Sequence, residues 1–188
     1  MTSWTRAELA SFAGRTIPDV MPDDLRLLFV GINPGLVSAA TGLHFARRGN
    51  RFYPALRDAG LVDSIDPAEA SARLSARGVG ITNLVARASA RADDLTAEEL
   101  RAGRTRLEAL VADREPRVVA VLGVTAYRQA FGELRAQAGR QPADLVKAQL
   151  WIAPNPSGLN AHATRESLAA DYGQIAAAAG LRLQAFRS

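Results

Sequence analysis

Short apolar runs of strand length alternate along the chain with longer segments whose apolar positions recur at helical spacing. The runs are rich in Val, Ile or Leu and end near Gly, Pro or Asn, which is typical of strands buried on both faces of a parallel sheet. The predicted strands cover residues 27–30, 79–85, 118–122 and 150–153.

The segments between and after these runs predict helices. They cover residues 50–59, 67–76, 96–113, 125–131 and 164–179. Thr96 and Glu99 have the spacing of a capping box, and Pro67 directly follows a potential N-cap, Asp66. Alternation of strands and helices predicts an α/β fold, a three-layer α/β/α domain with a mainly parallel central sheet of four to five strands.

The length of 188 residues fits one domain, 1–188, with residues 1–16 expected as an N-terminal helical extension. Residues 132–142 lack periodicity and predict a surface loop. No stretch approaches the length of a membrane span, and the N-terminus lacks the pattern of a secretory signal. We therefore expect a cytoplasmic protein that does not bind membranes.

Composition limits the chemistry that the chain can perform. It has no cysteine and only two histidines, His44 and His162, so no metal or other cofactor is expected. The formal net charge is +4, and every basic residue except Lys147 is arginine. Arginine suits phosphate contacts, although an arginine-rich composition can also reflect the base composition of a genome.

Three polar segments follow predicted strands, at the edge of an open α/β sheet where ligands bind. They are residues 31–35, 87–94 and 154–159. The first reads Gly-Ile-Asn-Pro-Gly, which predicts a type II turn with a positive φ at Gly35 and with Asn33 at its corner. A carboxamide in that place can hold a water molecule. No Gly-x-Gly-x-x-Gly follows the first strand, which argues against a dinucleotide-binding oxidoreductase.

Several separated motifs resemble one known family in order and spacing. They are Gly-Ile-Asn-Pro-Gly (31–35), Thr-Gly-Leu-His-Phe-Ala (41–46), Asn-Arg-Phe-Tyr (50–53), Gly-Ile-Thr-Asn-Leu-Val (80–85) and Asn-Pro-Ser-Gly-Leu (155–159). Together they resemble the mismatch-specific uracil-DNA and thymine-DNA glycosylases of the uracil-DNA glycosylase superfamily, over about residues 17–179.

This resemblance implies a monofunctional enzyme that flips uracil, or thymine or a modified pyrimidine opposite guanine, out of duplex DNA and hydrolyses its N-glycosidic bond. Its implied partner is double-stranded DNA with U:G or related mismatches, and we expect a monomer. By the family pattern Asn33 holds the attacking water, and Ile32, Phe45 and Asn155 form the base pocket. Phe45 also fits an ordinary core aromatic. Asn155 stands where the most efficient uracil glycosylases have histidine, which implies slower turnover.

The family pattern further implies that the loop Gly158-Leu159-Asn160 wedges into the helix where the base has left. A leucine in a loop rich in Gly and Pro is poorly placed for burial, which favours the wedge over a core position. The family commonly continues Gly-Leu-Ser-Arg, whereas this chain reads Gly-Leu-Asn-Ala-His. The arginine that contacts the orphaned guanine is therefore missing. His162 could replace it in part, or be an ordinary exposed loop residue.

Asp93 is a second catalytic candidate, because an oxocarbenium-like transition state gains from a nearby carboxylate and an amide such as Asn33 is no base. Asp93 and Asp94 also precede a predicted helix, where acids are favoured without catalysis, and we expect Asp94 to be structural. Arg47, Arg51 and Arg91 are candidate phosphate contacts, with solvated surface arginines as the alternative.

A non-catalytic α/β module that binds nucleic acid or a nucleotide is the rival interpretation of the whole chain. Asn33, Phe45 and Asn155 together favour the enzyme, because a module that only binds has no need of this set.

Overall fold

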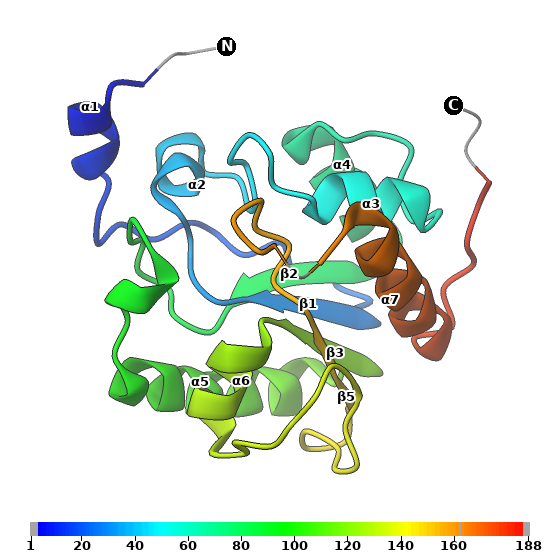
Figure 1. Cartoon of the computed structure of the whole chain (residues 1–188). Coiled ribbons are helices and arrows are strands. Elements are labelled where there is room, and N and C mark those ends of the chain that lie inside the picture. Colours follow the sequence, from blue (N-terminus) through cyan, green and yellow to red (C-terminus); the bar gives the residue numbers. More distant parts are fainter. Residues whose placement is uncertain (1–3, 162, 186–188) are drawn as a thin grey trace.

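The computed structural model describes residues 4–161 and 163–185. Its elements are, in chain order, α1 (Arg6–Ala10), β1 (Leu27–Gly31), α2 (Leu36–Thr41), α3 (Phe52–Asp58), α4 (Pro67–Ser75), β2 (Val79–Asn83), the 3-10 turn η1 (Ala92–Asp94), α5 (Ala97–Arg114), β3 (Val118–Leu122), α6 (Val124–Phe131), β4 (Gly139–Arg140), β5 (Gln149–Ala153) and α7 (Arg165–Ala178). Figure 1 shows their arrangement around a central sheet.

The five-stranded sheet has the order β2-β1-β3-β5-β4. β1 is parallel to both β2 and β3, β3 is parallel to β5, and only β4 runs antiparallel, against β5. The α/β fold with a mainly parallel sheet is therefore confirmed. Because four strands run the same way, the loops that leave them emerge along one edge of the sheet.

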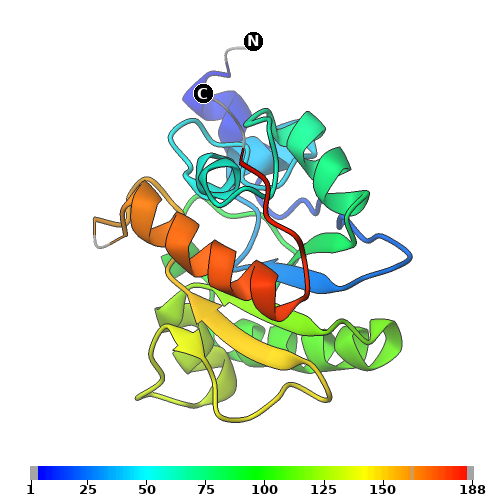
Figure 2. The same cartoon turned by 90° about the vertical axis from the view of Figure 1, so that its right-hand side faces the viewer.

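The sheet lies between two helical layers, each with its own core (Figures 1 and 2). Leu27 and Phe29 of β1 pack with residues of α3, α4 and α7 on one face. Leu28 and Val30 pack with residues of α5 and α6 on the other face. All four side chains are fully buried, as the unbroken apolar run of β1 predicts for a central parallel strand.

Both helix starts expected from capping signals are confirmed. Thr96 accepts a hydrogen bond from the backbone nitrogen of Glu99, while the Glu99 side chain accepts one from that of Thr96. Asp66 caps α4, with Pro67 as its first residue. These local signals set the helix boundaries because each N-cap side chain satisfies amide donors that the first helical turn leaves free.

Three elements differ from the sequence-based expectation. The predicted loop 132–142 contains β4, an edge strand of two residues that is too short to show periodicity. The second strand ends at Asn83, before the predicted 85. Directly after the Gly-Ile-Asn-Pro-Gly segment the chain forms α2, which was not predicted.

The predicted type II turn at this segment is wrong. Gly35 has φ −74° and ψ 164°, an extended conformation that any residue can adopt, and it is the N-cap of α2. The chain passes from β1 into a helix here rather than reversing in a tight turn. The physical reason is that Pro34 is compatible with helix entry as well as with a turn.

Of the extension expected over residues 1–16, the structure describes residues 4–16, which contain one short helix, α1, with no buried residue. His162 lies outside the described residues. Within the described parts of the chain, no helix combines the length and apolar character needed to cross a membrane.

Candidate active site

The three polar segments expected to converge do line one cavity, of about 910 Å³. Asn33 comes from the loop after β1, Ser89 and Asp93 from the loop after β2, and Asn155 from the loop after β5. The convergence follows from the parallel strands, which release all of these loops at the same edge. A cavity of this size can hold a nucleotide.

The carboxamide of Asn33 is held in one orientation. Its Nδ2 donates to Ser89 Oγ at 2.8 Å, to the carbonyl oxygen of Arg87 at 3.1 Å and to that of Pro34 at 3.3 Å. Ser89 Oγ donates in turn to the carbonyl oxygen of Arg91 at 2.6 Å, so toward Asn33 it acts as an acceptor. Because every partner accepts, the nitrogen must face the protein, and Oδ1 is the amide atom that the cavity can use.

Phe45 packs against the core and also lines the cavity, so it combines the core position and the pocket position that the sequence allowed. Its ring lies 4.1 Å from that of Phe52, centroid to centroid, and packs against the core, yet it also lines the cavity. Its φ of 54° is unusual for a bulky residue, and such strain often occurs at functional sites. Ile32 lines the cavity as well and packs toward Gly123.

Asn83 and His44 form a second oriented pair in the wall of the cavity. His44 is buried, and its Nε2 lies 3.1 Å from the carbonyl oxygen of Pro18, which can only accept. Nε2 therefore carries the proton, and Nδ1 accepts from Asn83 Nδ2 at 3.3 Å. Burial lowers the pKa of His44 and keeps the ring neutral, although the carboxylate of Asp19 acts in the opposite direction.

Gly31 makes room for this pair. A Cβ at position 31 would lie 2.5 Å from Asn83 Oδ1 and 3.2 Å from Phe45 Cζ. The missing side chain therefore leaves room for the amide oxygen of Asn83 and for the edge of the Phe45 ring beside the end of β1.

Residues 18–175 match the family model of the Uracil DNA glycosylase superfamily. The chain belongs to this superfamily. Membership assigns it a DNA glycosylase role and DNA as its partner.

A solved structure supports the fold of this glycosylase. The chain is similar to a candidate uracil DNA glycosylase from Methanosarcina acetivorans, whose structure was determined in solution by NMR, with a TM-score of 0.57 and 17% sequence identity. The match covers 86% of this chain and 98% of the other.

Arg51 of the glycosylase binds the loop expected to act as a wedge. Its guanidinium donates to the carbonyl oxygens of Asn160 at 3.1 Å and Gly158 at 3.2 Å, and also to that of Ala163. Its backbone nitrogen donates to the carbonyl oxygen of Pro156 at 2.9 Å. Because these contacts occupy the guanidinium, they argue against the phosphate contact expected for Arg51 and for a role in holding this loop.

The predicted wedge residues lie on an exposed turn. Leu159 is 75% exposed, in line with its expected loop position. Gly158 lies so close to Gly49 that a Cβ would approach the Gly49 carbonyl oxygen to 2.6 Å. Asn160 Nδ2 donates to the carbonyl oxygen of Asn155 at 3.0 Å, so this side chain stabilises the turn.

The amide oxygen of Asn155 is bound within its own loop. Its Oδ1 accepts from the backbone nitrogen of Ser157 at 3.0 Å. No acceptor for its Nδ2 is found in the described part of the chain, so this end is the donor that Asn155 can offer to the cavity.

Asp93 lines the cavity, but its geometry is that of a surface carboxylate. Its side chain is 85% exposed and lies 3.4 Å from Arg91 Nη2, which is itself 74% exposed. Asp94 has the structural role expected for it, since Oδ2 accepts from the backbone nitrogen of Arg91 at 2.9 Å. Arg47 is exposed and lines the same cavity.

Sequence reasoning missed Ser89, Asn83 and the role of Arg51. Asn83 carried one usable signal, because it is a polar residue at the carboxyl end of a buried strand, opposite Gly31 in the register. Ser89 and Arg51 carried none, because their partners lie on distant segments. Across residues 4–161 and 163–185, no three His, Asp or Glu side chains gather as a metal site would require.

Proposed function

We propose that this chain is a monofunctional glycosylase that flips uracil out of duplex DNA and hydrolyses its N-glycosidic bond, as the first step of base excision repair. The proposal extends to thymine and modified pyrimidines mispaired with guanine. The observation that carries it is the fixed amide of Asn33, whose Nδ2 is bound to Ser89 and Arg87 so that Oδ1 can accept from a water in the cavity.

In this mechanism the bond between C1′ and N1 breaks first, and its electron pair leaves with the base. The sugar becomes oxocarbenium-like, and the water bound to Asn33 Oδ1 adds to C1′ and then releases a proton to solvent. An amide is sufficient here because the electrophile is already a cation, so the water needs positioning more than deprotonation. Asp93 would add only long-range stabilisation, given its exposure.

The base would stack on Phe45, with Ile32 completing the pocket. Asn83 Oδ1 could accept from N3–H of uracil or thymine, a proton that cytosine lacks. Nδ2 of Asn155 and backbone amides would stabilise the uracil anion as it leaves.

Gly158, Leu159 and Asn160 would enter the helix as the base leaves it. The exposure of Leu159 and the anchoring of this loop by Arg51 support that role. A mispaired base costs less to extrude, which supplies part of the preference for mismatches. Arg47 and Arg91, both exposed beside the cavity, are the proposed phosphate contacts.

The proposal includes action as a monomer in the bacterial cytosol or nucleoid.

The test is single-turnover excision from duplexes with U:G, U:A or T:G pairs and from single-stranded uracil, measured as alkali-labile strand breaks. We expect cleavage of U:G DNA, and a fall of about a hundredfold or more for Asn33→Ala at unchanged DNA affinity. A wild-type protein that binds these duplexes and leaves every base in place would instead establish the non-catalytic binding module.

A further inference from the structure

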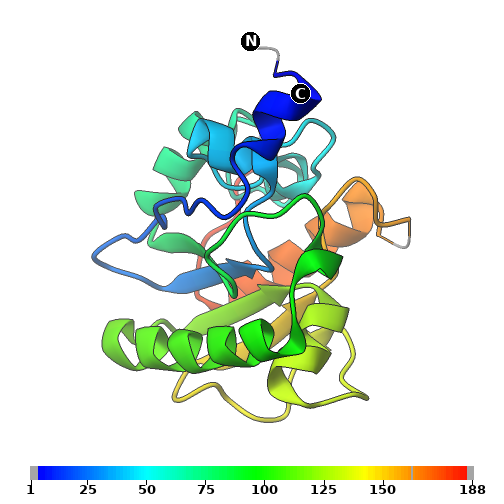
Figure 3. The same cartoon turned by 90° about the vertical axis from the view of Figure 1, so that its left-hand side faces the viewer.

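The N-terminal segment, residues 4–15, lies before the region matched by the superfamily model, and nothing in the mechanism above uses it. No residue of this segment is buried. Figure 3 shows the segment passing beside the loop between β2 and α5, which holds the partners of Asn33.

The segment contacts this loop through a reciprocal pair of backbone hydrogen bonds. Gly14 donates to the carbonyl oxygen of Ala88 at 2.9 Å, and the backbone nitrogen of Ala88 donates to the carbonyl oxygen of Arg15 at 2.7 Å. Ala88 is completely buried, so neither of its polar groups can turn to solvent instead.

The residues on either side of Ala88 bind the segment that carries Asn33. The carbonyl oxygen of Arg87 and Ser89 Oγ both accept from Asn33 Nδ2, and the backbone nitrogen of Ser89 donates to the carbonyl oxygen of Pro34 at 3.2 Å. Consecutive residues of an extended chain direct their polar groups to opposite sides. The loop is thus held between the N-terminal segment on one side and Asn33 with Pro34 on the other.

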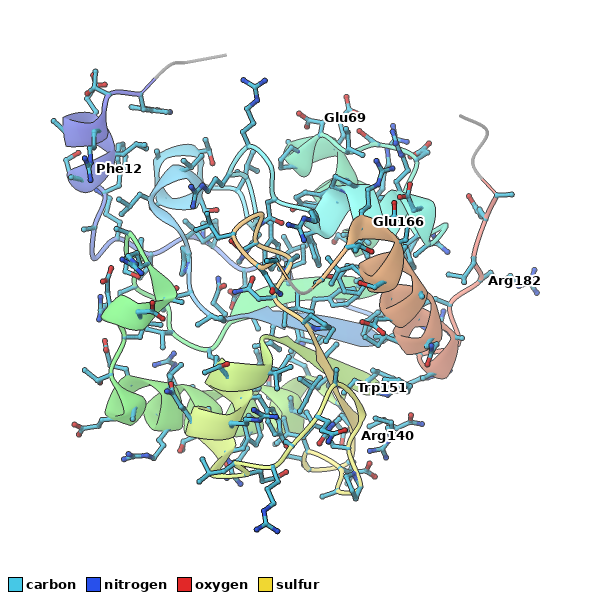
Figure 4. All side chains as sticks on the ribbon, viewed as in Figure 1. Phe12, Glu69, Arg140, Trp151, Glu166 and Arg182 are labelled. Carbon is cyan, nitrogen blue, oxygen red and sulfur yellow. The ribbon has the colours of Figure 1, made fainter. Side chains whose placement is uncertain are left out.

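The N-terminal segment also has structure of its own. Thr5 and Glu8 form a capping box at α1, and the rings of Trp4 and Phe12 meet edge to face at 5.3 Å. The Arg15 guanidinium lies 4.7 Å above the ring of Phe12, so the residue that binds Ala88 packs against the turn that follows α1. Phe12 lies at the outer margin of the molecule, away from the core (Figure 4).

We propose that the N-terminal segment is a positioning element of the active site, which fixes the orientation of the Asn33 amide through Ala88 and its two neighbours. The expected effect on the excision rate rests on the proposed function. The restraint of the Asn33 amide by the N-terminal segment does not depend on it. The segment places no side chain in the cavity. It restricts the movement of the acceptors that keep Asn33 Nδ2 turned toward the protein.

Gly14 allows a test in the full-length protein. It has φ +79°, and no atom lies within 4 Å of the place that a Cβ would take, so Gly14→Val strains the backbone without a clash. Gly132→Val is the matched control, because Gly132 has φ +74° in equally open space at the end of α6.

For Gly14→Val we expect the single-turnover rate of uracil excision to fall about tenfold, with a melting temperature no lower than that of Gly132→Val and unchanged affinity for DNA containing an uncleavable uracil nucleotide. Gly132→Val should retain the wild-type rate. In an Asn33→Ala background Gly14→Val should cause no further loss, because the segment acts through that amide. Equal rates for wild type and Gly14→Val, or an undiminished effect without Asn33, would overturn the proposal.

A second measurement is independent of catalysis. Hydrogen exchange of the Asn33 Nδ2 protons, followed by NMR, should be slow in the wild type and in Gly132→Val and at least tenfold faster in Gly14→Val. Unchanged exchange would refute the positioning role even if the enzyme is active. Faster exchange in a protein that excises no base would leave this role standing and remove the proposed function alone.

Discussion

His44 Nδ1 accepts a hydrogen bond from Asn83 Nδ2 at 3.3 Å, and this contact determines which end of the Asn83 amide faces the cavity. The carbonyl oxygen of Pro18 fixes the tautomer of the imidazole, and the imidazole fixes the amide. A backbone carbonyl outside the cavity therefore sets the hydrogen-bonding pattern that Asn83 presents to the cavity.

We expect His44→Phe to weaken discrimination between uracil and cytosine. Without Nδ1 as an acceptor, the Asn83 amide can turn and offer Nδ2 to N3 of cytosine. Single-turnover excision from U:G should fall about threefold to tenfold, and slow release of cytosine from C:G should become measurable. Tyr53→Phe is the control, since the Tyr53 hydroxyl donates to the backbone carbonyl of His44 and leaves its ring nitrogens unaffected. An unchanged uracil rate with no cytosine release would contradict this view of the pair.

The same histidine should make stability depend on pH. Burial lowers the pKa of His44 from 6.5, so below that pH the unfolded chain binds a proton that the folded protein resists. The free energy of unfolding should therefore decrease as the pH falls through 6.5 toward the lowered folded value, by at most about 1.4 kcal/mol per pH unit.

Urea titrations at pH 7.5, 6.5 and 5.5 measure this dependence, and His44→Phe isolates it. The free energy of unfolding of the wild type, minus that of the variant, should decrease as the pH falls, because only the wild type has His44. A constant difference would show that His44 binds protons equally in the folded and unfolded states over this range.

Arg51→Lys should impair excision from duplex DNA more than from single strands. A lysine cannot reproduce the planar fork that binds the carbonyl oxygens of Gly158 and Asn160, so the wedge loop loses its anchor. The duplex rate should fall about tenfold, whereas a single strand needs no wedge and should lose less than about threefold. Arg48→Lys, at an exposed neighbouring position, is the matched control. Equal losses on both substrates would indicate a general structural defect.

Asp93→Asn should change the single-turnover rate by less than about threefold. The carboxylate is exposed and paired with Arg91, and charges in that environment are screened by solvent and salt. Glu98→Gln, another exposed acid at the start of α5, controls for the change in net charge. A loss of a hundredfold for Asp93→Asn alone would instead establish a carboxylate as part of the catalytic machinery.

The sheet and the place of the site could be predicted from the sequence because both depend on local patterns. The apolar run of β1 and the capping box at Thr96 each depend only on residues close together in the sequence. Parallel strands then bring the loops that follow them to one edge of the sheet. The conformation of Gly35 could not be predicted, because Pro34 permits a turn and a helix start alike.

The orientation of the site residues could not be predicted from the sequence for another reason. His44 and Asn83 are 39 positions apart, and Arg51 and Gly158 are 107 apart. Such contacts depend on how whole elements pack, and no local spacing encodes them. The same holds for Gly14 and Ala88, whose hydrogen bond joins an exposed segment to a buried residue of the loop after β2.

Arg51 holds the wedge loop by its main-chain oxygens rather than by its side chains. A substitution at the exposed Leu159 therefore leaves these bonds intact, whereas a substitution of Asn160 would also remove the side-chain hydrogen bond to the carbonyl oxygen of Asn155. If Leu159 enters the DNA as proposed, its side chain can be exchanged, and the response to the opposite base altered, while Arg51 keeps the loop in place. Position 159 is therefore the natural starting point for engineering new lesion preferences.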